Sequence, residues 1–236
     1  MPILTKLDIE KLSRRVLANY LRQLDRPPER IDPIDFSERM LGLRFKATDL
    51  LLGKNILGLT SLADIEITVP YDNGQTQVLV LDGKTAYIDR QLMDIGNRGR
   101  LNFTMMHEAA HHLLDMFFPE ERHPILCRAA GSEMFDRIEW QANVMASCLL
   151  MPRELVRKTM HELGLGKMSR QVHKIYLASD YSKLSRMAEK LGVSKTALFI
   201  QLNQLGLMDR YFFTPHSDME ILPTKEEIAM EALWLE

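Results

Sequence analysis

The chain has 236 residues, of which 46% are hydrophobic and 26% charged, and its formal net charge at pH 7 is −2. This composition suits a globular protein with a sizeable apolar core, and it excludes a chain that is basic throughout to hold nucleic acid. The two cysteines, Cys127 and Cys148, form no CxxC pair, and we find no secretory leader and no apolar run of the roughly 20 residues that a membrane span needs. We therefore expect a cytoplasmic protein without a disulfide framework.

The first part of the chain predicts helices followed by strands. Apolar residues recur at helical spacing from Leu7 to Leu24, and a second, short helix is expected in IDFSERMLGL, ending near Gly42. Residues 56–69 are rich in β-branched side chains, and YDNGQ at residues 71–75 favours a hairpin turn. With TQVLVLDG and KTAYID, which follow, these segments predict an antiparallel sheet of about three strands, an order typical of α+β proteins.

After Gly99 the pattern becomes helical. Helices are expected over residues 101–118, from about 132 to 150, and from about 153 onward. Residues 181–208, YSKLSRMAEKLGVSKTALFIQLNQLGLM, then show two short apolar patterns around a glycine turn, which is typical of a helix-turn-helix. Its second helix carries one basic residue, Lys195, whereas helices that enter a DNA groove usually cluster lysine and arginine. This pattern favours packing or partner docking over DNA contact.

These boundaries predict three regions. Residues 1–152 form the first domain, residues 153–208 form a helix-turn-helix-like region, and residues 209–236 form an acidic tail that ends in a helix. Thr224 and Glu227 in this tail have the spacing of a capping box, which predicts where the terminal helix begins.

The segment FTMMHEAAHHLL predicts a metal site on a helix. His107 and His111 are four residues apart, so both imidazoles lie on one helix face and can bind one ion. Glu108 follows the first histidine, where its carboxylate can reach a water on the metal and act as a general base. A catalytic zinc site also needs a third protein ligand and an open position.

The segment EWQAN offers that third ligand. Glu139 can complete a His, His, Glu set, and Asn143, one helical turn later, can accept a hydrogen bond from the far ring nitrogen of a ligand histidine. Other carboxylates remain open as the third ligand: Glu133, Asp136 and Asp115. Four side chains are candidates for stabilising a developing oxyanion: His112, His173, Tyr176 and Tyr181.

Taken together, NRGRLNFTMMHEAAHHLL and EWQANVMASCLLMP resemble the ImmA/IrrE metallopeptidases, zinc enzymes of the gluzincin kind. The shared pattern is approximately RxxFTxxHExxHxxL followed by ExEANxFAxxLLMP. The resemblance extends from the first helix to the end of the helix-turn-helix-like region. The chain departs from the pattern at Gln141, where the family often has a second glutamate, and at VMAS, where FAAE is common. Because Gln141 should point away from the face of Glu139, we expect little effect on the metal site.

The resemblance implies a small antiparallel sheet packed on a zincin-like helical core, with Zn²⁺ as the cofactor. It implies an endopeptidase that cleaves a specific partner, often a helix-turn-helix repressor of a mobile element, phage or stress regulon. The alternative is a non-enzymatic regulator that binds DNA or a repressor and uses the metal only to stabilise its fold. Glu108 favours the peptidase, because a structural zinc site needs no general base.

Overall fold

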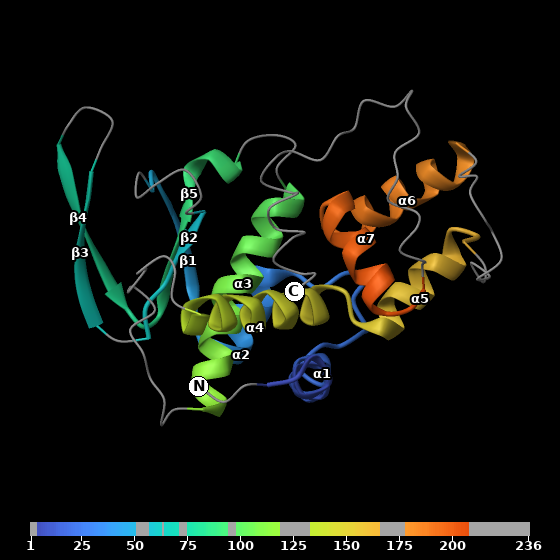
Figure 1. Cartoon of the computed structure of the whole chain (residues 1–236), viewed down its shortest axis with the longest axis horizontal. Helices are drawn as coiled ribbons and strands as arrows, with labels where there is room; N and C mark the ends of the chain where they lie inside the picture. Colours follow the sequence, from blue (N-terminus) through green and yellow to red (C-terminus); the bar gives the residue numbers. More distant parts are fainter. Residues whose placement is uncertain are drawn as a thin grey trace. The chain divides into compact units, whose positions relative to one another are not determined.

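The computed structural model describes residues 4–50, 57–62, 64–70, 75–93, 98–118, 133–165 and 178–207. It divides the chain into two compact units, residues 1–150 and 151–236. The first unit contains helices α1 to α4 and both sheets, and the second contains helices α5 to α7 (Figure 1). The predicted acidic tail lies outside the described residues.

Helices α1 (Lys6–Leu21) and α2 (Pro33–Leu41) begin at side-chain caps. Thr5 and Asp8 form a capping box at α1, and Asp32 accepts hydrogen bonds from the first amides of α2. The α2 helix ends at Gly42, whose φ of 64° places it in the left-handed region that glycine adopts without strain. The sequence located both helices, and α1 ends earlier than predicted.

The two N-terminal helices are joined by a buried tyrosine. The ring of Tyr20 packs edge-on against Phe36 with centroids 5.2 Å apart, and its hydroxyl donates a 2.7 Å hydrogen bond to Asp35 Oδ2. Burial, then this hydrogen bond, raises the pKa of Tyr20, and the same bond lowers the pKa of Asp35. Arg39 also bonds Asp35 at 2.7 Å, one helical turn away.

The strands form two sheets. Strand β5 (Thr85–Asp89) pairs in parallel with β1 (Arg44–Thr48) and antiparallel with β2 (Gly58–Leu59), which gives the order β1-β5-β2. Strands β3 (Asp64–Pro70) and β4 (Thr76–Asp82) form a separate antiparallel hairpin, as the turn signal between them predicts.

The α+β class is confirmed, but the prediction of one antiparallel sheet is wrong. The missed strand is β1, RFKAT, which has no apolar run because Phe45 and Ala47 are separated by Lys46. Its neighbour β5 is buried along its whole length, as expected for a central strand. A five-residue strand that gains its partner from a segment about 40 positions later leaves little local signal.

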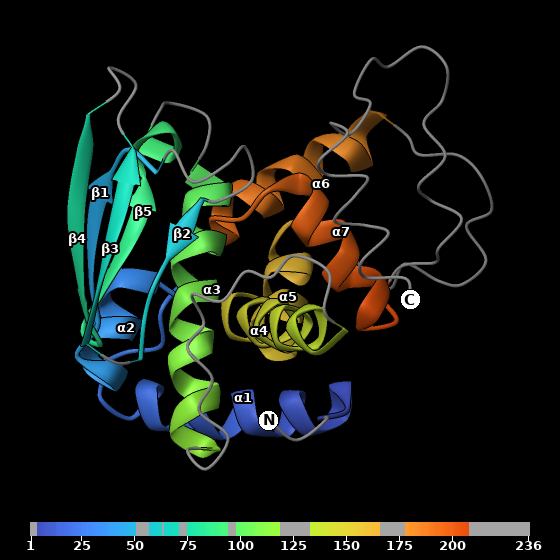
Figure 2. The ribbon, with the colours of Figure 1, turned by 60° about the vertical axis from the view of Figure 1, so that its left-hand side comes forward.

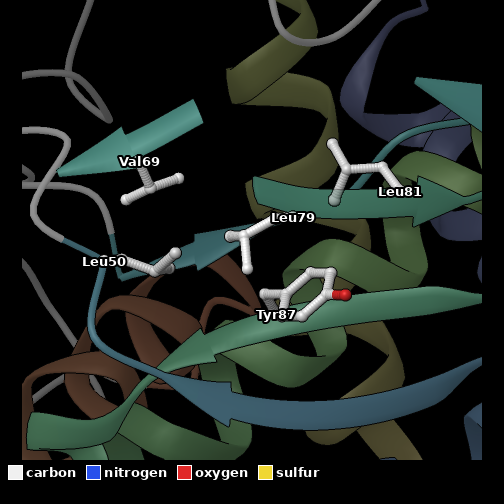
Figure 3. Close-up of a cluster of buried hydrophobic side chains, with 5 residues drawn as sticks. All are labelled: Leu50, Val69, Leu79, Leu81 and Tyr87. Carbon is white, nitrogen blue, oxygen red and sulfur yellow. The ribbon is translucent and has the colours of Figure 1, made fainter. Parts of the chain in front are cut away.

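One core lies between the hairpin and β5. Figure 3 shows its five buried side chains: Leu50, Val69, Leu79, Leu81 and Tyr87. Leu59 of β2 packs against this cluster, together with the partly buried Ile65 and Ile67. Alternate residues of β3 and β4 face the cluster and the others face solvent, because side chains of a strand point to opposite faces in turn.

Helices α3 (Arg98–Phe117) and α4 (Glu133–Leu150) pack together in the first unit. Ala109 and Ala110 of α3 and Ala142 and Ala146 of α4 are fully buried. Small side chains let two helix backbones approach closely, so they bring residues on the two contact faces within reach of each other. Helix α1 also packs on α4, and α2 packs on α3.

The second unit contains α5 (Arg153–Glu162), α6 (Ala178–Leu191) and α7 (Lys195–Gln204). Helices α6 and α7 flank a turn at Gly192, where φ is 70°, and Ser194 caps α7 by accepting from Ala197 N. The two short helices that the sequence predicts are thus present. None of the helices among the described residues combines the length and apolar character needed to cross a bilayer.

Candidate metal centre

Helix α3 presents two imidazoles toward one point. The rings of His107 and His111 are one turn apart, meet at 88° with centroids 4.6 Å apart, and have their Nε2 atoms 3.0 Å from each other. His111 is 3% exposed and His107 is partly buried. The four-residue spacing of these histidines therefore brings two nitrogen atoms close enough to coordinate one metal ion.

Helix α4 brings a carboxylate to the same point. Glu139 Oε2 lies 3.2 Å from His107 Nε2, and Glu139 Oε1 lies 3.4 Å from His111 Nε2. These three residues form a group able to hold a metal ion among the described side chains. Of the rival carboxylates, Asp115 is not part of the group, and the side chains of Glu133 and Asp136 lie outside the described residues.

The imidazole of His107 and the carboxylate of Glu139 shift each other's pKa. Burial lowers the pKa of His107, but the Glu139 carboxylate and then Glu108 raise it by more. Burial raises the pKa of Glu139, and hydrogen bonding to His107 and His111 lowers it by far more, so that carboxyl is ionised at neutral pH. A partly buried carboxylate beside two imidazole nitrogen atoms is an arrangement that can bind a divalent cation.

The donor atoms also fit a transition metal by their spacing. Zinc binds nitrogen and oxygen at about 2.0–2.1 Å, so tetrahedral ligand atoms lie about 3.3 Å apart. The two Nε2 atoms lie 3.0 Å apart, and a different Glu139 oxygen lies beside each of them, at 3.2 Å from His107 and 3.4 Å from His111, which is close to that spacing. Two imidazoles in the set favour zinc or a neighbouring transition metal over calcium or magnesium, which prefer oxygen ligands.

Glu108 lies on the side of α3 that faces strand β2. Its side chain is 5% exposed, and it is so close to the Cα of Gly58 that a Cβ built on that glycine would collide with Oε1. The same added Cβ would lie 2.8 Å from Thr104 Cγ2. The carboxylate is therefore confined between its own helix and the backbone of β2.

Asn143 lies one turn after Glu139 on α4. Its side chain is near enough to His107 to raise the pKa of that imidazole, yet His107 Nδ1 is buried without a hydrogen-bond partner in the described part of the chain. That Asn143 orients His107 therefore stays a prediction. Gln141 is 3% exposed and its Oε1 accepts a 3.2 Å hydrogen bond from Leu4 N, so it tethers the N-terminal segment to α4.

Of the four candidate oxyanion donors, His112 and Tyr181 lie among the described residues. His112 Nε2 shares a 2.6 Å hydrogen bond with Thr60 Oγ1 in a buried position. Burial, and then the charge of His111, lowers the pKa of His112 to about 4, so this imidazole is neutral at physiological pH. Tyr181, in the second unit, accepts a 2.9 Å hydrogen bond from Lys195 Nζ. His173 and Tyr176 lie outside the described residues.

Sequence reasoning did not identify Gly58 and Thr60 as neighbours of the site. One signal was present: a lone glycine within a strand-forming stretch often marks the close approach of another group. The group that approaches, Glu108, is 50 positions away in the chain, so its identity depends on how β2 packs on α3.

Comparison with known proteins gives one finding. Residues 96–203 match the sequence model of the IrrE N-terminal-like domain, peptidase family M78. This segment includes the three candidate metal ligands and Glu108, and it runs into α7. The match confirms the resemblance read from the two motifs. A comparison with curated protein sequences finds no match.

Proposed function

The chain belongs to the IrrE-like peptidase family over residues 96–203, and on this basis we propose that it is a metal-dependent endopeptidase. The observation that carries the proposal is the convergence of His107, His111 and Glu139 within 4.8 Å of one another, with the Glu108 carboxylate adjacent on α3. A site built only to stabilise the fold has no need of that fourth group.

We propose that the three side chains hold zinc. When bound, a divalent zinc ion supplies Lewis acidity: it polarises the scissile carbonyl and acidifies water. The chain contributes the Nε2 atoms of His107 and His111 and the carboxylate of Glu139, whose oxygens lie 3.2 and 3.4 Å from those nitrogen atoms. We propose that Asn143, which raises the pKa of His107, orients that imidazole.

Glu108 is the proposed general base. Its carboxylate accepts a proton from the attacking water and then delivers it to the leaving amine, which a peptide requires because its amide nitrogen is a poor leaving group. Helix α3 and the backbone of Gly58 restrict the conformations of this carboxylate, so it is held in position before the substrate binds.

We propose that strand β2, beside this base, is the edge on which the substrate chain docks. Strand β2 is the end strand of the sheet β1-β5-β2 within the described residues, and Gly58 in that strand lies against Glu108. We propose that the scissile peptide binds in an extended conformation along β2, because an end strand offers main-chain groups to an added strand. Binding of this kind uses hydrogen bonds to the substrate's main chain. Any preference for a particular substrate sequence must therefore come from side-chain contacts elsewhere.

The proposed substrate is a helix-turn-helix repressor, and the proposed location is the cytoplasm. The first rests on the ImmA/IrrE resemblance, whose members typically cut one regulatory partner. The second rests on the cysteine content of the sequence, two residues without a CxxC pair, which predicts no disulfide framework.

The alternative, a DNA-binding regulator, gains little from the helix-turn-helix-like region. All residues of α7 are at least partly buried, and Gln201 Nε2 donates a 3.0 Å hydrogen bond to Met151 O within the second unit. A helix that reads the major groove needs an exposed face with basic side chains. We therefore propose a packing role for α7.

The decisive test is cleavage by the purified full chain. The chain is loaded with Zn²⁺ and incubated with any helix-turn-helix repressor that is found encoded beside its own gene, and separately with a proteome-derived peptide library read by mass spectrometry for new termini. Glu108→Gln should retain zinc and lose about 10²–10⁴-fold in cleavage rate, and a chelator should stop the wild type. Cleavage by Glu108→Gln at the wild-type rate, or no zinc in the purified protein, refutes the proposed function.

A further inference from the structure

Strand β2 and the residue after it run beside one stripe of α3. Gly58 faces Glu108, and Thr60 Oγ1 bonds His112 Nε2 at 2.6 Å. Glu108 and His112 are four residues apart, which is a rise of about 6 Å along a helix, and Gly58 and Thr60 are two residues apart, about 6.7 Å along a strand. The two spacings match, so both contacts can be made at once. Figure 2 shows β2 alongside α3.

Apolar side chains on both sides of Gly58 also anchor this segment. Leu59, between the two contact residues, points away from α3 and packs against the hydrophobic cluster of the hairpin. Leu57 packs against a second cluster that includes Ile88 and Met105. Backbone pairing with Ile88 and Tyr87 fixes the strand on β5, and the apolar contacts pack it against the two clusters. Neither the pairing nor these contacts form a hydrogen bond from the strand to the stripe of α3 that carries Glu108.

The Thr60 and His112 contact is directional. Thr60 is 1% exposed and His112 is 9% exposed, so the hydrogen bond is shielded from water and its loss leaves a buried polar group without its partner. It lies one helical turn beyond Glu108 on the same stripe, so any slip of the strand past the helix breaks it. The bond therefore fixes the position along α3 at which Gly58 meets the Glu108 carboxylate.

We propose that His112 and Thr60 are positioning residues: their hydrogen bond fixes strand β2 along α3 so that the backbone of Gly58 confines the carboxylate of Glu108. The catalytic consequence rests on the proposed function, whereas the structural consequence for β2 does not. His112 thereby receives a role different from the oxyanion contact that the sequence left open. It acts through Thr60 and Gly58.

The test compares Thr60→Val, which removes the hydroxyl, with Thr60→Ser, which keeps it. Thr85→Val is the matched control, because Thr85 is also buried in this unit and its hydroxyl donates to Asp82 at 3.2 Å, away from α3. Each full-length protein is loaded with Zn²⁺, and kcat and KM are measured on the cleaved peptide. We expect kcat to fall about tenfold in Thr60→Val at unchanged zinc content, and to be retained in Thr60→Ser and Thr85→Val.

Amide hydrogen exchange provides a readout that needs no cleavage. Exchange of residues 57–61 should be at least tenfold faster in Thr60→Val than in the wild type, and unchanged in the other two variants. The proposal is overturned if the exchange rates of residues 57–61 are equal in the wild type and the three variants. It is also overturned if kcat of Thr60→Val is within twofold of that of Thr60→Ser. If Thr60→Val does not fold, Thr60→Ala removes the same hydroxyl with a smaller side chain and is judged by the same limits. A wild type that shows no cleavage dependent on Glu108 refutes the proposed function instead, and exchange then decides whether the bond holds β2.

Discussion

Replacing Gly58 with alanine adds one methyl group between strand β2 and the proposed base. The added Cβ would lie 2.8 Å from Thr104 Cγ2 and 2.9 Å from Glu108 Cδ. Carbon atoms pack best at about 3.5–4.0 Å, so these neighbours must move by about 0.6–1.2 Å. The φ of Gly58 is outside the left-handed region, so the backbone accepts alanine and the whole effect is steric.

The methyl group added at Gly58 displaces the carboxylate of Glu108, the proposed general base, whose position determines the reaction rate. Misplacing a reacting group by about 1 Å can lower the rate about 10²-fold, which corresponds to about 2.7 kcal/mol in the activation free energy. Overpacking at this position should also lower the free energy of unfolding by about 1–3 kcal/mol. The metal ligands are on another face of α3, so zinc content should stay at the wild-type value.

The assay measures kcat/KM on the cleaved peptide, zinc by elemental analysis, and stability by urea unfolding. Gly42→Ala is the matched control: no atom lies within 4 Å of its added Cβ, but its φ of 64° makes alanine strained by about 1 kcal/mol. It should lose stability and keep activity. If Gly58→Ala is folded, zinc-loaded and within threefold of the wild-type kcat/KM, the carboxylate is not confined by β2 and the reasoning is refuted.

Two further outcomes follow from other contacts. Glu139→Gln removes the anionic ligand and should weaken zinc binding by more than about 100-fold, which competition with a chromophoric chelator measures; wild-type affinity would exclude Glu139 as a ligand. Tyr20→Phe keeps the ring contact with Phe36 but removes the hydrogen bond to Asp35, and it should lower the free energy of unfolding at pH 7 by about 1 kcal/mol, since that carboxylate is partly in solvent. The Tyr20 hydroxyl lowers the pKa of Asp35 in the folded state, so this stabilisation is present above the unfolded pKa of about 4 and is lost as pH falls further. Urea unfolding of both proteins from pH 7 to pH 3 should show the difference shrinking below about pH 4, and a difference that grows there would contradict this account.

Much of this protein follows from local pattern. The spacing of His107 and His111 places both on one helix face whatever surrounds the helix, because 3.6 residues complete a turn. The caps at Thr5 and Asp32 mark where helices begin, and YDNGQ marks the hairpin, since each depends on neighbours within a few positions.

Other features depend on which surfaces meet, and only the tertiary structure decides them. Glu139 was one of four carboxylates in the sequence that could serve as third ligand, and it is the packing of α4 on α3 that carries its oxygens to within 3.4 Å of both imidazoles. The parallel pairing of β1 with β5, and the approach of Gly58 to Glu108, likewise join segments about 40 to 50 positions apart. A residue's own neighbours along the chain determine its conformation and the face it occupies. Which helix or strand packs against that face depends on how complete helices and strands fit together in the core, and no local sequence pattern contains that information.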